Sequence, residues 1–470
     1  MKKRSIGYLV LTMLLSFSVI LSACGSSGGG NSANGGSGNG AGSTNSSGNA
    51  GNSGDGGNAS GDTGSGNSSS TDSGGSGKQV TLSFWTLFDG GDGDNMQAMV
   101  DEFNKTHPDI QVKNTKLAWG EYYTKLITAV GNGNGPDVGI SHTSRLPDLI
   151  DQGVVTELDD TAADAGVDWS TFNQNLLNAT IVDGKHYAVP IDTHPFIMFY
   201  NTKLLKEAGL LGADGKPVLE QSADGFMTFL KTLKEKLPAK VTPFALSNSN
   251  DDPYRFWWAL YSQLGGNDLV ADDLKTAAVD KEKGIKAAEY IQNLYKQGYI
   301  KKNDPDFYKN FQSGTAAIMM TGVWATGTWE TTKGLEFGAM PIPKIFDQEA
   351  TWGDSHTIIL PVTKKEDPDK RKAAITFANW IADNGQIWAK AGHIPSKPSV
   401  LEKEEYKAMP YRSDYAVVAS TVKFNKPSTK NWQIRDNVSF KFLNEVWADK
   451  MTPAEAMDKM QEGVQKELND

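Results

Sequence analysis

Cysteine is almost absent from this sequence, because Cys24 is the only one in 470 residues. The chain after it therefore has no disulfide, no thiolate metal site and no cysteine nucleophile. Beyond the leader, no apolar run approaches the 18 residues that indicate a membrane-spanning helix. Positive charge is scarce as well, since the net charge is −10. An acidic chain without a basic stripe argues against nucleic acid as a partner and against binding anionic lipid through the protein surface.

Aromatic residues are missing from residues 25–77, which are almost wholly Gly, Ser and Asn and contain no Lys or Arg. Such a composition cannot bury enough apolar surface to offset the entropy of ordering, so we expect a disordered tether. A Gly/Ser-type coil of this length has a root-mean-square span of about 40 Å. Its three aspartates offset the three basic residues of the leader, so residues 78–470 keep the charge of −10.

The N-terminal leader, residues 1–23, has basic residues at positions 2–4 and an apolar run over residues 6–20. This run is short for a spanning helix, which needs about 20 residues, and it is typical of a secretory signal peptide. The tetrad Leu-Ser-Ala-Cys at 21–24 resembles the bacterial lipoprotein signal. That resemblance implies cleavage before Cys24 and a multi-chain lipid on its thiol, which anchors the chain at the extracellular face of the cell membrane. The alternative is an ordinary signal peptide with an incidental cysteine.

The remaining chain, residues 78–470, is too long for one compact core and indicates two domains. Residues 79–87 alternate, with Val80, Leu82 and Phe84 on one face and Trp85 on the other, which predicts a first strand. Strands are also expected at 109–115 and after Pro136, and helices are expected near 96–103, at 121–131 and at 146–151, with a Gly- and Asp-rich loop from Asp89. This alternation predicts an α/β fold with largely parallel sheets and ligands beyond the carboxyl ends of the strands.

Six stretches in order resemble the extracellular solute-binding proteins of ABC importers, in the sugar-binding family. They are EFNKTHPDIQV, GPDVGISH, DGKHYAVPIDTHPFIMFYNTKLLKEAGL, FQSGTAAIMMTGVWATG, WGDSHTIILP and AGHIPSKPSV. Each motif alone is weak, but together they cover essentially all of residues 79–470. The resemblance implies a non-enzymatic receptor that captures a carbohydrate, most simply an oligosaccharide. It also implies delivery to an ABC permease, with no cofactor or metal, and we expect a monomer.

The same resemblance implies a two-lobe periplasmic-binding-protein-like fold of type II, with a mostly parallel sheet flanked by helices in each lobe. Lobe 1 is expected at 78–190 and 343–397, and lobe 2 at 191–342 and 398–470, joined by a three-segment hinge. Prolines stand at all three proposed crossings, at positions 190, 341 and 343, and 395. Proline fixes its own φ and keeps the preceding residue extended, which suits a strand-like hinge.

A sugar offers C–H patches that stack on aromatic rings and hydroxyls that need planar polar partners. Tryptophans outside core positions with Asp, His or Arg nearby are therefore the candidate ligand-binding residues, and Trp324, set among small residues, is the strongest of them. In the run before Trp258, Tyr254 and Trp258 share a helical face, so one face is expected to be core and the other cleft. The predicted ligand-binding residues are Trp85, Asp89, Trp119, His142, Asp192, His194, Tyr254, Trp257, Trp258, Trp324, Trp352, Asp354, His356, His393 and Arg435. The tryptophans expected in the core are Trp380, Trp388 and Trp447.

Three other functions were weighed. No metalloprotease, α/β-hydrolase or P-loop motif is present, but a secreted glycan-degrading enzyme with two carboxylates remains an alternative, since its acids can come from anywhere in the chain. A charged solute such as a sugar phosphate would need a basic cluster, for which only Arg145, Arg255 and Arg435 are plausibly placed. The Asp-rich stretches 89–95 and 248–253 lack the Gly and Glu offsets of a calcium-binding EF-hand, so solvated turns are favoured.

Overall fold

The computed structural model describes residues 79–249 and 251–470. The signal peptide, the lipid on Cys24 and the tether lie outside the described residues and stay predictions. All of the described residues belong to one compact unit. Among the helices of the two described ranges, none combines the length and the hydropathy that crossing a membrane requires.

The first sheet has five strands in the order β2-β1-β3-β12-β6. Their bounds are β1 (Val80–Thr86), β2 (Ile110–Lys116), β3 (Val138–His142), β6 (Ala188–Pro190) and β12 (His356–Ile359). Strands β2, β1 and β3 are parallel, whereas β12 is antiparallel to both of its neighbours. The sheet is therefore mixed, with β12 as the single reversed strand, rather than wholly parallel.

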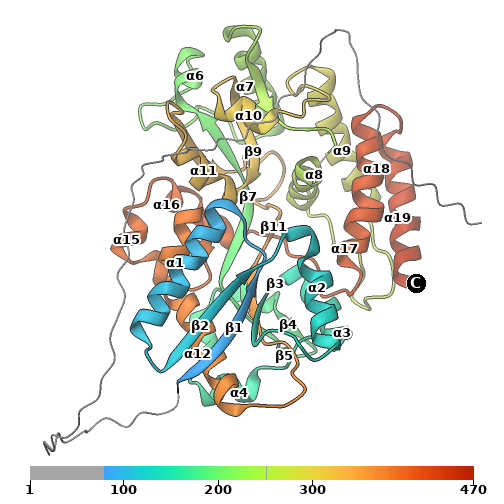
Figure 1. The fold of residues 1–470 in the computed structure, drawn as a ribbon. Coiled ribbons are helices and arrows are strands. Elements are labelled where there is room, and N and C mark those ends of the chain that lie inside the picture. The colour runs from blue at the N-terminus through green and yellow to red at the C-terminus, as the bar shows by residue number, and fades with distance from the viewer. Residues whose placement is uncertain (1–78, 250) are drawn as a thin grey trace, which may run out of the picture. The chain divides into compact units, whose positions relative to one another are not determined.

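The order of these strands fixes where a ligand can enter. The chain passes from β1 to β2 through α1 (Gly90–Thr106) and returns past β1 to β3 through α2 (Trp119–Gly131). Because such crossovers are right-handed, the two helices lie on opposite faces of the sheet, as Figure 1 shows. The crevice beyond the carboxyl ends of β1 and β3 is then the topological switch point where open α/β sheets bind ligands.

The alternation predicted for the first strand builds the core beneath it. Leu82 and Phe84 are fully buried, and the ring of Phe84 packs edge-on against Phe377 of α12 (Pro368–Asp383). Phe103 of α1 meets the same ring at 4.9 Å, so α1 and α12 close one face of the sheet together. Further helices beside this sheet are α3 (Leu146–Asp151), α4 (Asp159–Asp164) and α13 (Gly385–Trp388).

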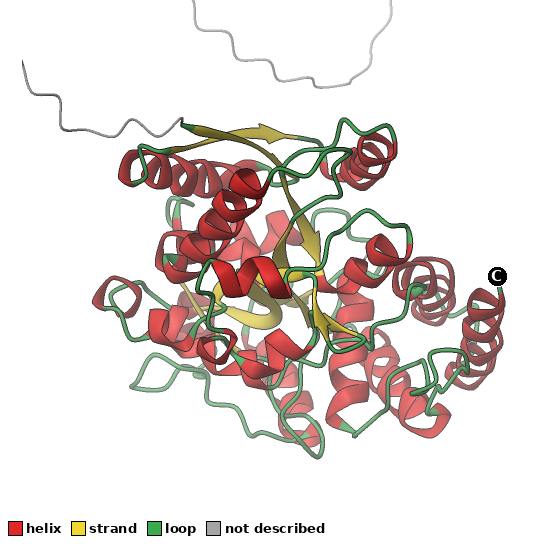
Figure 2. Ribbon diagram, turned by 90° about the horizontal axis from the view of Figure 1, so that it is seen from below, coloured by secondary structure: helices red, strands yellow, loops and turns green. Residues whose placement is uncertain are grey.

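The second sheet has the main order β10-β7-β9-β8 and a separate hydrophobic core. Its strands are β7 (Asp192–Asn201), β8 (Thr242–Ala245), β9 (Ala316–Gly322) and β10 (Phe337–Pro341), of which β7 runs against the others. The helices around it include α6 (Thr202–Glu207), α7 (Ala223–Lys236), α8 (Asp251–Gln263), α9 (Lys281–Lys296), α10 (Phe307–Gln312), α11 (Thr326–Glu330), α16 (Arg412–Tyr415), α18 (Phe440–Trp447) and α19 (Pro453–Asn469). Figure 2 shows helices surrounding the strands.

Three chain segments pass between the two sheets, and all of them meet at β7. The first passage runs from β6 into β7 through Ile191, and Figure 1 shows β7 continuing into the second sheet. The second runs from β11 (Gly353–Asp354), which pairs with β7, into β12. The third is β13 (Ile394–Pro395), which also pairs with β7.

The second passage lies later in the chain than the expected boundary at 343. Ile342, Ile345 and Trp352 pack in the core of the second sheet, so the chain leaves that sheet only at Asp354. Two local expectations also change. The Gly- and Asp-rich stretch after Asp89 forms the first turns of α1 instead of a loop, and Trp119 is the first residue of α2.

Candidate functional site

A cavity of about 1100 Å³ opens where the carboxyl ends of β1 and β3 face the second sheet. Both sheets contribute to its walls, since His142 ends β3 while Trp324 follows β9. Ten of the fifteen residues predicted from the sequence line it: Asp89, Trp119, His142, His194, Trp324, Trp352, Asp354, His356, His393 and Arg435.

Strand register explains why the polar residues converge at the floor of this cavity. The antiparallel pairing of β12 with β3 sets His356 directly opposite His142, and the pairing of β11 with β7 sets Asp354 opposite His194. Asp192 and His194 are two residues apart on β7, so they point to the same side of the strand. His393 joins them from the residue just before β13.

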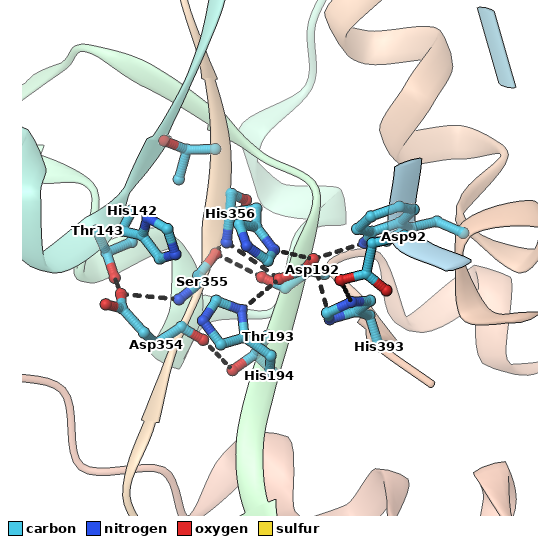
Figure 3. Close-up of polar contacts among 12 residues, drawn as sticks. Asp92, His142, Thr143, Asp192, Thr193, His194, Asp354, Ser355, His356 and His393 are labelled. Carbon is cyan, nitrogen blue, oxygen red and sulfur yellow. Dashed lines mark hydrogen bonds and ion pairs between the residues drawn. The ribbon is translucent and has the colours of Figure 1, made fainter. Parts of the chain in front are cut away.

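The carboxylate of Asp192, which is fully buried, lies at the centre of this group (Figure 3). It accepts hydrogen bonds from the backbone N–H of His356 at 3.0 Å and from Nε1 of Trp388 at 2.5 Å. The ring Nδ1 atoms of His356 and His194 lie 2.7 and 3.1 Å from its oxygens. Burial acts to raise the pKa of Asp192, but His356 and His393 outweigh it and hold that pKa well below its usual value. Asp192 does not itself line the cavity, so it positions the histidines that do.

Asp354 forms a second buried polar centre next to the first. Both of its carboxylate oxygens accept side-chain hydrogen bonds, one from Thr143 and one from Ser144. Burial acts to raise its pKa, but the nearby His142 outweighs this and lowers it. His142 bonds to the hydroxyl of Tyr123 through Nδ1 at 2.7 Å, and burial lowers the pKa of its ring. The pKa values of His194 and His356 are lowered by burial as well.

Two indole rings and one guanidinium form the wall on the side of the second sheet. The Arg255 guanidinium lies 5.0 Å from the ring centre of Trp324 and 4.7 Å from that of Trp352. Asp251 and Asp252 hold Arg255 in place through ion pairs of 3.0 and 2.6 Å. Such an arrangement presents flat aromatic faces beside fixed charged groups.

Gly322 accounts for the position of Trp324. A Cβ atom at residue 322 would fall 1.9 Å from the indole of Trp324, so the ring needs a glycine beneath it. Gly322 is one of the small neighbours on which the prediction for Trp324 was based, and it is the residue that leaves room for the indole ring.

Trp432 connects the two sides of the cavity. Its indole stacks on Trp119, with ring centres 5.5 Å apart and planes tilted by 20°, and its Nε1 donates to the hydroxyl of Ser144 at 2.9 Å. The Arg435 guanidinium lies 4.3 Å from the centre of the same ring. Trp119 remains 45% exposed, so part of its face is open to the cavity.

Five of the predicted residues do not line the cavity. Besides Asp192 these are Trp85, Tyr254, Trp257 and Trp258. The expectation that one aromatic face of the run before Trp258 points into the cleft is wrong, because all four aromatic rings of that run, including Phe256, pack in the core of the second sheet. The indole N–H groups of Trp257 and Trp258 donate to backbone carbonyls there. Trp85 packs at the edge of the first core instead.

Sequence reasoning missed several residues of the cavity wall. The principal ones are Phe88, Asp92, Tyr308, Glu330, Lys390 and Trp432. Trp432 follows a polar stretch without core periodicity, which was a usable signal. Asp92 was assigned to a solvated turn, but the first turn of α1 brings it to His393, whose Nε2 lies 3.2 Å from its carboxylate.

The comparisons with known proteins agree on one family. A family model described as bacterial extracellular solute-binding protein matches residues 98–412, about two thirds of the chain. The chain is 25% identical over 331 residues to the diacetylchitobiose binding protein DasA of Streptomyces coelicolor, covering 68% of this chain and 74% of DasA.

Solved structures agree at the level of the fold. The GacH receptor of Streptomyces glaucescens, solved unliganded and with acarbose, superposes with a TM-score of 0.72 at 23% identity, covering 83% of this chain and 99% of GacH. UgpB from Mycobacterium tuberculosis, solved with glycerophosphocholine, also gives 0.72, at 18% identity and with coverage of 83% and 99%. At these identities the likeness shows a shared α/β fold of the type II periplasmic-binding-protein kind.

Proposed function

This chain belongs to the family of bacterial extracellular solute-binding proteins, and from that premise we propose that it captures a carbohydrate in the cavity between its two sheets. The carbohydrate is then handed, chemically unchanged, to the permease of an ABC importer. The observation that carries this proposal is the composition of the cavity wall, which contains four indoles together with carboxylates, histidines and arginines.

This wall suits the two faces of a sugar. The rings of Trp119, Trp324, Trp352 and Trp432 offer flat apolar surfaces for C–H patches. Fixed polar groups such as Asp354 and Arg255 offer partners for hydroxyls, and buried groups of this kind reject ligands without hydroxyls. The cavity volume of about 1100 Å³ is at the upper end for small-molecule pockets, which supports an oligosaccharide over a single sugar ring.

We further propose that the two sheets and their cores move as two lobes about the three passages at β7. A ligand that touches Trp119 on one side and Trp324 on the other makes both contacts only in the closed form, so it shifts the population toward closure. We keep the lobe boundaries expected from the sequence with one change. Residues 343–352 are assigned to the second lobe, because Ile345 and Trp352 pack in its core. A monomer suffices for this mechanism.

The location of the protein follows from its N-terminus. We propose that the leader is removed before Cys24, that the thiol carries the lipid, and that residues 25–77 tether the binding unit outside the cell membrane. The extracellular family and the hydropathy of residues 1–24 support this assignment.

The charge of the cavity argues against the charged-solute alternative. Seven carboxylates line it, against two arginines and one lysine. A phosphate group would meet a net negative wall, since the arginines Arg255 and Arg435 are already paired with aspartates.

The glycan-degrading alternative is tested by looking for cleavage products, because a binding protein returns every glycan intact after prolonged incubation.

Isothermal calorimetry against separate panels of α-glucan, chitin-derived and arabinose oligosaccharides tests the proposed ligand class, with glycerol phosphate as the charged comparison. We expect saturable binding of one oligosaccharide class and none of glycerol phosphate. Tight binding of the phosphate alone, or cleavage products in the incubations, would contradict the proposal.

Trp324→Ala tests the aromatic wall. Truncating a buried tryptophan at a binding hot spot costs at least about 2 kcal/mol, so we expect the Kd for the oligosaccharide to rise about 30-fold or more. The matched control is Trp169→Ala, because Trp169 stacks on His186 away from the cavity. Unchanged affinity in Trp324→Ala with the fold retained would remove Trp324 from the site.

A further inference from the structure

The floor of the cavity contains four buried side chains whose ligand atoms converge on one point. Asp192, His194, His356 and His393 each offer an oxygen or a ring nitrogen, and these atoms all lie within 4.8 Å of one another. We propose that they form a binding site for a divalent transition metal ion, Zn²⁺ being the best match. This proposal departs from the sequence expectation of no metal and does not depend on which solute the cavity takes.

His393 gives the first independent reason. Its side chain is fully buried, and its Nδ1 has no hydrogen-bond partner. That nitrogen faces the Asp192 carboxylate at 3.6 Å, which is too long for a hydrogen bond (Figure 3). A buried polar atom without a partner is costly, and a cation between the two side chains would give the nitrogen a partner.

The spacing of the four groups matches a small tetrahedral ion. Zinc binds imidazole nitrogen and carboxylate oxygen at about 2.0–2.2 Å, so neighbouring ligands in a tetrahedron are about 3.4 Å apart. The Nδ1 atoms of His356, His194 and His393 lie 2.7, 3.1 and 3.6 Å from Asp192. Imidazole and carboxylate donors suit zinc, copper and nickel, whereas calcium and magnesium prefer sites made of oxygen alone.

The surrounding groups orient these side chains as outer-shell partners do in metal sites. The Asp92 carboxylate lies 3.2 Å from Nε2 of His393, so it can accept a hydrogen bond from an N–H at that atom, which leaves the lone pair on Nδ1 and facing Asp192. Trp388 donates to Asp192 and stacks on the ring of His393 with centres 4.6 Å apart and planes 3° apart, which fixes the ring.

Most of the histidines of this chain gather at this point. The chain has six histidines. Three of them belong to the cluster, and a fourth, His142, lies beside it with its ring 4.8 Å from that of His356. The cluster residues His194, His356 and His393 line the cavity, so an ion bound there would be reached from the ligand side.

The test uses the chain without an affinity tag, freed of metal by chelator and dialysis. Titration with Zn²⁺ is followed by calorimetry, and titration with Co²⁺ is followed by visible absorption, which intensifies in a tetrahedral site. We expect one equivalent of each ion to bind and the melting temperature to rise with Zn²⁺. His393→Gln should weaken Zn²⁺ binding about 100-fold or more and abolish both the tetrahedral spectrum and the thermal shift, and Asp92→Asn should weaken it about 10- to 100-fold.

Two histidine controls and one thiol control keep the result specific. His107→Gln and His186→Gln alter histidines outside the cavity, and Cys24→Ser removes the single thiol; all three should bind Zn²⁺ like the parent. Circular dichroism checks that each variant is folded, and His194→Gln replaces His393→Gln if the latter fails. No Zn²⁺ uptake by the metal-free parent, or uptake that folded His393→Gln and His194→Gln retain in full, would overturn the proposal.

Discussion

Arg412 joins the start of α16 to two segments that line the cavity at Glu330 and Lys390, and its removal offers a sharp test of the structure. The side chain is 1% exposed and lies at the start of α16. Its guanidinium pairs with both carboxylate oxygens of Glu330 in α11. It also donates to the backbone carbonyls of Ala389, Lys390 and Pro410. Burial acts to lower the pKa of Arg412, but the bonds to Glu330 outweigh it and raise that pKa, so the group stays charged.

The expected magnitude follows from what Arg412→Met leaves behind. Methionine replaces the apolar stem but none of the donors, so the Glu330 carboxylate and three carbonyls lose their partner. Breaking a buried ion pair by removing one member costs about 3–5 kcal/mol. The side chain of Glu330 is 25% exposed and can regain some water, which places the expectation near 3 kcal/mol.

Urea unfolding followed by tryptophan fluorescence and circular dichroism measures the loss. The control is Lys216→Met, which breaks the ion pair of Lys216 with Asp414 on the same helix; both side chains are about half exposed, so the cost should be below about 1 kcal/mol. In a double-mutant cycle, Glu330→Gln with Arg412→Met should lose less than the sum of the single changes. A cost for Arg412→Met no larger than that of Lys216→Met would refute this reasoning.

Two further predictions concern stability away from the cavity. Burial acts to raise the pKa of Asp137, but hydrogen bonds from Lys370 and Ser83 outweigh it and lower that pKa. The resulting stabilisation is complete above the unfolded-state pKa of about 4 and is lost as pH falls through the folded-state pKa. In urea titrations, the difference in unfolding free energy between the parent and Asp137→Asn should therefore shrink below pH 4 and stay constant above pH 6. A difference that grows toward acid pH would contradict this reasoning. Trp257 is fully buried in the core of the second sheet, so Trp257→Ala should cost about 3–5 kcal/mol of unfolding free energy. The same change should leave oligosaccharide affinity unchanged, which calorimetry on the folded variant measures. A loss of affinity would contradict the assignment of Trp257 to the core.

The first sheet was predictable because its signals are local. The alternation over Val80, Leu82 and Phe84 gives a strand whose buried face matches the structure. The helix expected at 121–131 is also present, although it begins two residues earlier, at Trp119. The reversed direction of β12 was not predicted, because strand direction depends on a pairing between residues more than 200 positions apart.

The aromatic run of α8 shows why helical periodicity failed at the cavity. An amphipathic reading assigns one face to the core and the other to a cleft, but all residues of α8 except Asp251 and Arg255 are buried. A helix that is apolar nearly all round is enclosed by the protein. The polar residues at its start were therefore the better signal for the cavity, and Arg255 was considered only for a charged solute.

The polar cluster could be predicted in composition but not in arrangement, because each passage between the sheets supplies one part of it. Asp192 and His194 come from the first passage, Asp354 and His356 from the second, and His393 from the third. A change in the angle between the sheets must bend the backbone at these segments, so it alters the distances among the same side chains. In the closure proposed above, any ligand or ion held by this cluster would therefore be coupled to the movement directly through the backbone that carries it. This coupling gives a physical reason for placing buried charge where an apolar hinge would be more stable.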